Sequence, residues 1–123
     1  MPNKKPFSWS ARAKSFTYSW DGLKALMQTE HNAHIHLACS VAVVIAGFLF
    51  RINLTEAMAL VISMGMVWTA EIFNTAIEKA MDFISTEKHP QIGLVKDLAS
   101  AAVLVAAIAA FIVGCLVFIP KLF

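Results

Sequence analysis

Hydrophobic residues follow two different patterns, one before residue 30 and one after it. Between residues 9 and 27 they recur every three or four positions, which predicts a helix with one apolar stripe. The stripe consists of Trp9, Ala13, Phe16, Trp20, Leu23 and Met27. Basic and polar residues fill the remaining positions, so this helix, predicted over residues 8–29, is too polar to cross a bilayer. We expect it to lie in the membrane interface. A helix packed on a soluble partner would show the same stripe.

Three longer apolar segments follow. Residues 98–119 contain no charge and, at 1.5 Å per residue, are long enough to cross a hydrocarbon core of roughly 30 Å. Residues 35–50 are interrupted only by His36, and residues 57–70 are free of charge. The pattern predicts an all-α integral membrane protein. Its membrane-spanning helices are expected at residues 31–51, 55–85 and 93–119, and the whole chain, residues 1–123, is expected to form one domain.

The segments between these helices carry turn signals. Residues 51–56 are expected to form a tight turn, with Asn53 and Thr55 as candidate helix caps. The second connection, residues 85–93, contains the helix breakers Pro90 and Gly93.

The basic residues predict an orientation. Most of them lie before the first span or around the second connection: Lys4, Lys5, Arg12, Lys14, Lys24, Lys79, Lys88 and Lys96. Only Arg51 and Lys121 fall on the opposite side. By the positive-inside rule, the N-terminus and the second connection face the cytoplasm.

Composition supports a membrane protein, since 59% of the residues are hydrophobic and 15% are charged. A formal net charge of +2, spread along the chain, gives no basis for nucleic-acid binding. Cys39 and Cys115 lie in apolar segments and are predicted to be free thiols. No cleavable signal peptide is expected at the N-terminus.

Polar residues gather at one end of the second span. Glu71, Asn74, Thr75, Glu78 and Asp82 form a stripe in which the first and last glutamates are two turns apart, roughly 10 Å. The predicted topology brings this stripe to the same depth as Glu30, Lys96 and Asp97. Carboxylates in an apolar region are costly unless they are paired, solvated or bound to a cation, so a functional site is predicted. Asp82 fits a solvated helix end equally well.

These residue types suit phosphoryl transfer. Carboxylate and amide oxygens are ligands for Mg²⁺, a lysine can bind phosphate, and a carboxylate near the lipid can accept the proton of a hydroxyl group. The scattered glycines and the lack of a G-x-x-x-x-G-K-[ST] motif exclude a P-loop enzyme. His31, His34 and His36 match no zinc spacing, and we interpret them as interfacial histidines beside an independently acting Glu30.

The polar segments also resemble a known family. The sequence A-E-I-F-N-T-A-I-E-K-A-M-D at residues 70–82, followed by T-E-K-H, Gly93 and K-D-L-A-S-A-A-V, resembles the prokaryotic diacylglycerol kinase and undecaprenol kinase family. Y-S-W-D-G-L at residues 18–23 and the region of Glu30 look like its N-terminal motifs. The resemblance extends from about residue 13 to residue 119.

The resemblance implies a homotrimeric kinase of the bacterial inner membrane that transfers the γ-phosphate of MgATP to a lipid alcohol. Glu71 would accept the alcohol proton, Glu30 and Glu78 would hold Mg²⁺, and Ser100 would lie near the lipid. The nucleotide site would comprise Tyr18, Glu30, Asn74, Glu78, Glu87, His89, Lys96 and Asp97. Ala11 stands where the family has a basic residue, so Arg12 or Lys14 would replace it.

The segment E-H-N-A-H-I-H at residues 30–36 looks more like the undecaprenol kinase branch than like the diacylglycerol kinase branch. This likeness favours undecaprenol over diacylglycerol as the substrate. Two other function classes fit the pattern without the resemblance. One is an oligomeric channel or transporter in which the glutamate stripe carries ions or protons. The other is a structural subunit that anchors partners through its interfacial helix.

Overall fold

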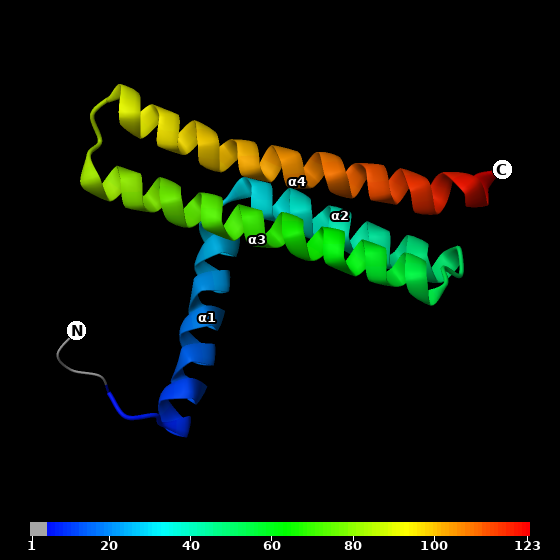
Figure 1. The fold of residues 1–123 in the computed structure, drawn as a ribbon, viewed down its shortest axis with the longest axis horizontal. Helices are drawn as coiled ribbons and strands as arrows, with labels where there is room; N and C mark the ends of the chain where they lie inside the picture. Colours follow the sequence, from blue (N-terminus) through cyan, green and yellow to red (C-terminus); the bar gives the residue numbers. More distant parts are fainter. Residues whose placement is uncertain (1–4) are drawn as a thin grey trace.

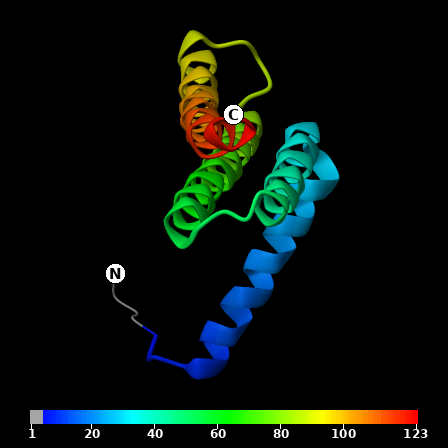
Figure 2. The same cartoon turned by 90° about the vertical axis from the view of Figure 1, so that its right-hand side faces the viewer.

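The computed structural model describes residues 5–123, which form four α-helices and no strand. The helices are α1 (Trp9–Thr29), α2 (His31–Leu49), α3 (Leu54–Ile84) and α4 (Pro90–Leu122). Helices α2, α3 and α4 run side by side in alternating directions, and α1 leaves this bundle steeply (Figures 1 and 2). The all-α prediction is therefore confirmed. Lys4, which contributed to the predicted orientation, lies outside the described residues.

A single residue separates α1 from α2. Glu30 has an extended backbone, with φ −116° and ψ 117°, and its N–H group donates to the carbonyl oxygen of Leu26. The Nε2 atom of His34 lies 2.5 Å from the carbonyl oxygen of Met27 and ties the start of α2 to the end of α1. The chain therefore changes direction sharply at Glu30.

The connection between α2 and α3 is a tight turn, as predicted. Arg51 occupies the left-handed region with φ 52°, an uncommon conformation for a residue with a side chain. Asn53 caps α3 in a reciprocal box with Glu56, with hydrogen bonds of 2.8 and 3.0 Å. Asn53 is thus confirmed as a cap, whereas the prediction for Thr55 is wrong because that residue lies inside the first turn of α3.

The connection between α3 and α4 is shorter than the sequence predicted. Helix α4 begins at Pro90, because a proline in the first helical turn sacrifices no backbone hydrogen bond. Gly93 lies inside this helix, and its N–H group donates to the carbonyl oxygen of His89. Pro90 therefore starts a helix here instead of breaking one.

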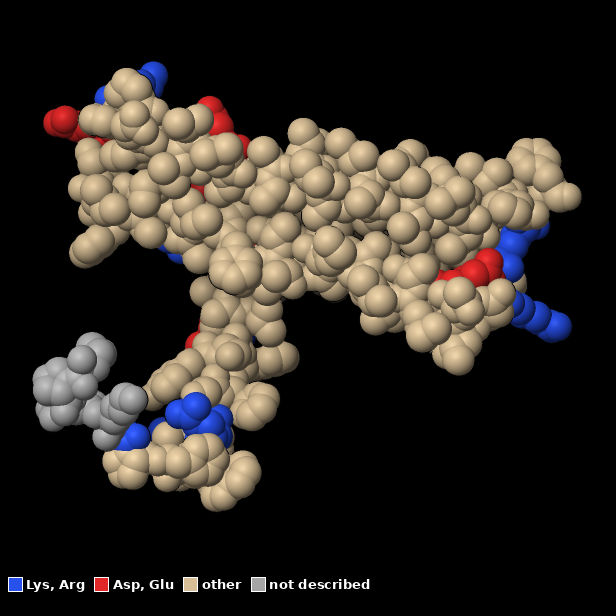
Figure 3. Space-filling model, viewed as in Figure 1, with Lys and Arg blue, Asp and Glu red and all other residues tan. Residues whose placement is uncertain are grey.

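Most of the surface of the bundle is apolar. The buried apolar core is small, consisting of Leu26, Ala33, Leu60, Val67, Ala99, Ala106 and Val117, while many large apolar side chains are exposed. Figure 3 shows charged residues at the two ends of the bundle and on α1, with an uncharged band between the ends on this face. Helices α2, α3 and α4 are all long and apolar enough to cross a membrane. The protein is an integral membrane protein.

Cys39 and Cys115 are both free, as predicted.

Candidate active site

The site is centred on a buried carboxylate of α3. The side chain of Glu71 is only 1% exposed, although Glu is among the residues least often buried. Its Oε2 atom, Asn74 Oδ1 and Thr75 Oγ1 are buried and have no hydrogen-bond partner within residues 5–123. Three such atoms within five positions are costly in a membrane protein. The cluster is therefore expected to be completed by a ligand or by another chain.

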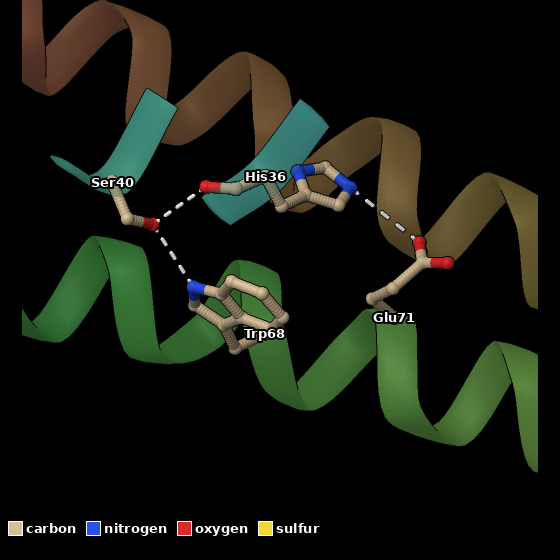
Figure 4. A network of polar contacts seen from close by, with 4 residues as sticks. All are labelled: His36, Ser40, Trp68 and Glu71. Atoms are coloured by element: carbon tan, nitrogen blue, oxygen red, sulfur yellow. Dashed lines mark hydrogen bonds and ion pairs between the residues drawn. The ribbon is translucent and has the colours of Figure 1, made fainter. Parts of the chain in front are cut away.

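A histidine of α2 faces this carboxylate. Figure 4 shows the ring of His36 directed at Glu71, with Nε2 3.5 Å from Oε2. Neither His36 nor Thr75 was expected from the sequence to have a role of its own in the site. The only signal for Thr75 was its place in the polar stripe.

Two further carboxylates lie near one another: Glu78 on α3, and Glu30 at the break between α1 and α2. Glu78 is half-buried, and its charge interacts with those of Glu30, Glu71, Asp82 and Lys96. Glu30 is half-buried at the break between α1 and α2, and its side chain makes no capping hydrogen bond. The structure thus brings the two predicted metal ligands into one electrostatic neighbourhood and leaves the Glu30 carboxylate available.

This donor set fits a lightly held magnesium ion. Across the described residues, no group of three His, Cys, Asp or Glu side chains is placed to hold a metal by itself. Mg²⁺ commonly keeps several waters and binds through one or two carboxylates together with substrate phosphates. Glu30 and Glu78 are carboxylates of the kind that this mode of binding would use.

A polar pocket opens at the connection between α3 and α4. Its volume is about 530 Å³, and its lining includes Asp82, Glu87, His89 and Lys96. Lys96 Nζ donates to Asp82 Oδ1 at 2.5 Å. Three of the predicted nucleotide-binding residues and the unassigned Asp82 therefore share one pocket.

An apolar cavity lies on the other side of the site. It measures about 590 Å³ and is formed by α2, α3 and α4. His36, Ser40 and Ser63 are the main polar residues in its lining, which otherwise consists mostly of aliphatic and aromatic side chains such as Val43, Leu60 and Phe111. Such a lining suits a hydrocarbon chain far better than a nucleotide.

Five of the residues predicted for the site belong neither to the cluster around Glu71 nor to the lining of the polar pocket or the apolar cavity. Tyr18, Arg12 and Lys14 are exposed on α1, which projects from the bundle (Figure 1). Asp97 and Ser100 are exposed on α4. In the described part of the chain, none of these side chains forms a hydrogen bond or ion pair with the site. Their roles stay predictions.

The exposed pair of Asp82 and Lys96 leads to a testable expectation. Their side chains are 60% and 36% exposed, and such pairs contribute only about 0–1 kcal/mol to stability. Asp82→Asn should therefore leave the melting temperature almost unchanged. If Asp82 orients Lys96 toward a phosphate, the same variant should raise the KM for ATP several-fold. An unchanged KM would identify Asp82 as a solvated helix end.

Comparisons with known proteins place the chain in a family of kinases. The family described as prokaryotic diacylglycerol kinase matches residues 17–118. The undecaprenol kinase of Bacillus subtilis is 38% identical over 109 residues, covering 89% of each chain. The diacylglycerol kinase of Escherichia coli K12 is 40% identical over 104 residues, covering 84% of each. The diacylglycerol kinase of Synechocystis is 36% identical, and the match covers 88% of this chain and 62% of that longer protein.

Proposed function

This chain belongs to the prokaryotic diacylglycerol kinase family, and we propose that it transfers the γ-phosphate of MgATP to the hydroxyl group of a membrane lipid alcohol. Its relatives named for undecaprenol and for diacylglycerol are both lipid kinases, and this chain is a lipid kinase as well. The observation that carries the proposed chemistry is the buried carboxylate of Glu71. Along α3, Glu71 lies between Val67, which lines the apolar cavity, and Asp82, which lines the polar pocket.

The direction of α1 supports a membrane boundary near Glu71. In Figure 1, α1 leaves the bundle where α2 begins, and the connected ends of α3 and α4 continue beyond that level. If the amphipathic α1 lies in the interface, those ends and the polar pocket project into water. The basic residues favour the cytoplasmic side. We therefore place the N-terminus and the site on the cytoplasmic face of the bacterial inner membrane.

The proposed reaction is a direct in-line transfer. The lipid hydroxyl oxygen attacks the γ-phosphorus, the bond to the β-phosphate oxygen breaks, and ADP leaves. Glu71 accepts the hydroxyl proton, and Lys96 contacts the phosphates of the nucleotide. A magnesium ion held by Glu30 and Glu78 would neutralise charge on the phosphates.

The remaining site residues line the two substrates. Asn74 supports the phosphate end of the site, and Ser100 lies beside the lipid. The nucleotide is contacted by Tyr18, Glu87, His89 and Asp97. Because Ala11 stands where the family has a basic residue, Arg12 or Lys14 supplies the positive charge instead. Glu87 and His89 are supported by their place in the polar pocket.

A homotrimer would complete the site. Glu71, Asn74 and Thr75 each have a buried polar atom without a partner in the described part of the chain, and the bundle exposes many large apolar side chains. Neighbouring copies of the chain could cover part of this surface and supply the missing polar contacts. The number of copies rests on the family resemblance.

A panel of lipid alcohols tests the proposed function. Purified protein in detergent is incubated with Mg²⁺, ATP labelled at the γ-position, and either undecaprenol or diacylglycerol. Labelled lipid is expected with both, and a higher kcat/KM is expected with undecaprenol, since residues 30–36 are similar to that branch. A preference for diacylglycerol would reverse the substrate assignment. Absence of labelled lipid throughout would favour an ion or proton pathway along the glutamate stripe.

A further inference from the structure

The carboxylate of Glu71 has one ion-pair contact among the described residues, to His36. Its Oε2 atom is buried without a hydrogen bond, and His36 Nε2 lies 3.5 Å from it. This distance is slightly too long for a good hydrogen bond. Catalytic contacts are often long before substrate binds and shorten in the reactive complex. The imidazole is therefore placed to donate to Oε2 when substrate is bound.

His36 is contacted at its backbone by Ser40 and at its ring by Trp68. Ser40 Oγ donates to the backbone carbonyl oxygen of His36 at 2.7 Å and accepts a hydrogen bond from Trp68 Nε1 at 2.9 Å. The indole of Trp68 also lies edge-on to the imidazole, with ring centroids 6.2 Å apart. Figure 4 shows these contacts linking α2 to α3 one turn away from Glu71. The two hydrogen bonds therefore tie the backbone of His36 to α3, and the indole of Trp68 flanks the imidazole on the side of α3.

Ordinary helix packing does not require this arrangement. The side chain of His36 is 17% exposed and lines an open apolar cavity, so it is not needed to fill a closed core. The imidazole of His36 offers a hydrogen-bond donor to one side of the Glu71 carboxylate. In Figure 4 the second carboxylate oxygen of Glu71 points away from the ring.

We propose that His36 is a positioning residue for Glu71: Nε2–H binds Oε2 and holds the carboxylate so that its other oxygen meets the lipid hydroxyl. The inference rests on the proposed role of Glu71 as the proton acceptor. His36 forms no bond to either substrate. It acts by fixing the orientation of the group that does.

Three variants of His36 test this role. His36→Leu and His36→Asn are expected to lower kcat by about 10- to 100-fold, the range that misplacement of a reacting group by about 1 Å can produce. The KM for ATP should stay within twofold of the wild-type value, a range that we set as the criterion. His36→Gln places an amide N–H near the position of Nε2 and should recover most of the lost kcat. A merely structural role would not separate Gln from Asn in this way.

A matched histidine provides the control. His31 lies on the same helix, is exposed, and has its ring centroid 6.4 Å from that of His34. His31→Leu should leave kcat unchanged. Full activity of His36→Leu alongside an inactive Glu71→Gln would overturn the inference and leave the proposed function intact. An active Glu71→Gln would instead overturn the proposed function. Equal losses in His36→Gln and His36→Leu, with unchanged melting temperatures, would also contradict the positioning role.

Discussion

Glu71→Gln is expected to lower the rate of lipid phosphorylation by about 10²- to 10⁴-fold, the usual contribution of a general base. Glutamine has nearly the same shape as glutamate but cannot accept the hydroxyl proton. The substitution replaces a buried charge with a neutral amide, so it should not destabilise the fold. Affinity for ATP should be retained, because the polar pocket lies elsewhere, at the α3–α4 connection.

The same helix offers a control for this result. Glu56 lies at the opposite end of α3, where it caps the helix and forms an ion pair with Lys121 at 3.0 Å. Glutamine preserves the capping pattern, so Glu56→Gln should phosphorylate lipid at the wild-type rate. Near-normal turnover by Glu71→Gln would rule out Glu71 as the base. Loss of ATP binding in that variant would show that Glu71 serves the nucleotide instead.

Glu78→Gln is expected to act on the metal requirement. Loss of a carboxylate ligand should raise the Mg²⁺ concentration for half-maximal activity by at least about 10- to 100-fold, because even outer-shell changes at metal sites have effects of this size. Activity should recover in part at high Mg²⁺, unlike the loss in Glu71→Gln. Titration of turnover with Mg²⁺ at saturating ATP measures this shift.

Glu30→Gln should also raise the Mg²⁺ concentration needed for half-maximal activity, because Glu30 lies near Glu78 at the break between α1 and α2. Asp82→Asn provides the comparison, since Asp82 is near Glu78 but is paired with Lys96. An unchanged Mg²⁺ requirement in both Glu78→Gln and Glu30→Gln would remove these residues from the metal site. An increased Mg²⁺ requirement in Asp82→Asn alone would indicate that the metal binds nearer to the α3–α4 connection.

The helices could be predicted because each one depends on a local pattern. A charge-free segment longer than a bilayer core forms a helix in lipid whatever its neighbours are, since only a helix satisfies its backbone there. The cap at Asn53 was equally local, as it needs only Glu56 three residues later. The prediction that Pro90 breaks a helix was wrong, because proline disfavours the interior of a helix but is well suited to its first turn.

Contacts between helices could be predicted only in part. The hairpin of α3 and α4 makes it possible to foresee that Asp82 and Lys96 come close. The pairing of His36 with Glu71 depends on the register between α2 and α3, which no periodicity within one helix specifies. The direction of α1 depends on the extended backbone of Glu30 and on the contact between His34 and Met27. Sequence therefore could not show whether Tyr18 reaches the site.

The most direct test of whether the chemistry takes place at Glu71 is the transfer of label from the γ-position of ATP to lipid. The transfer is compared between the wild type and Glu71→Gln, and nucleotide occupancy is measured in the same samples. The expected result is labelled lipid from the wild type and almost none from Glu71→Gln, with both proteins equally occupied by ATP. Equal labelling by the two proteins, or no labelled lipid from the wild type, would contradict a kinase mechanism based on Glu71.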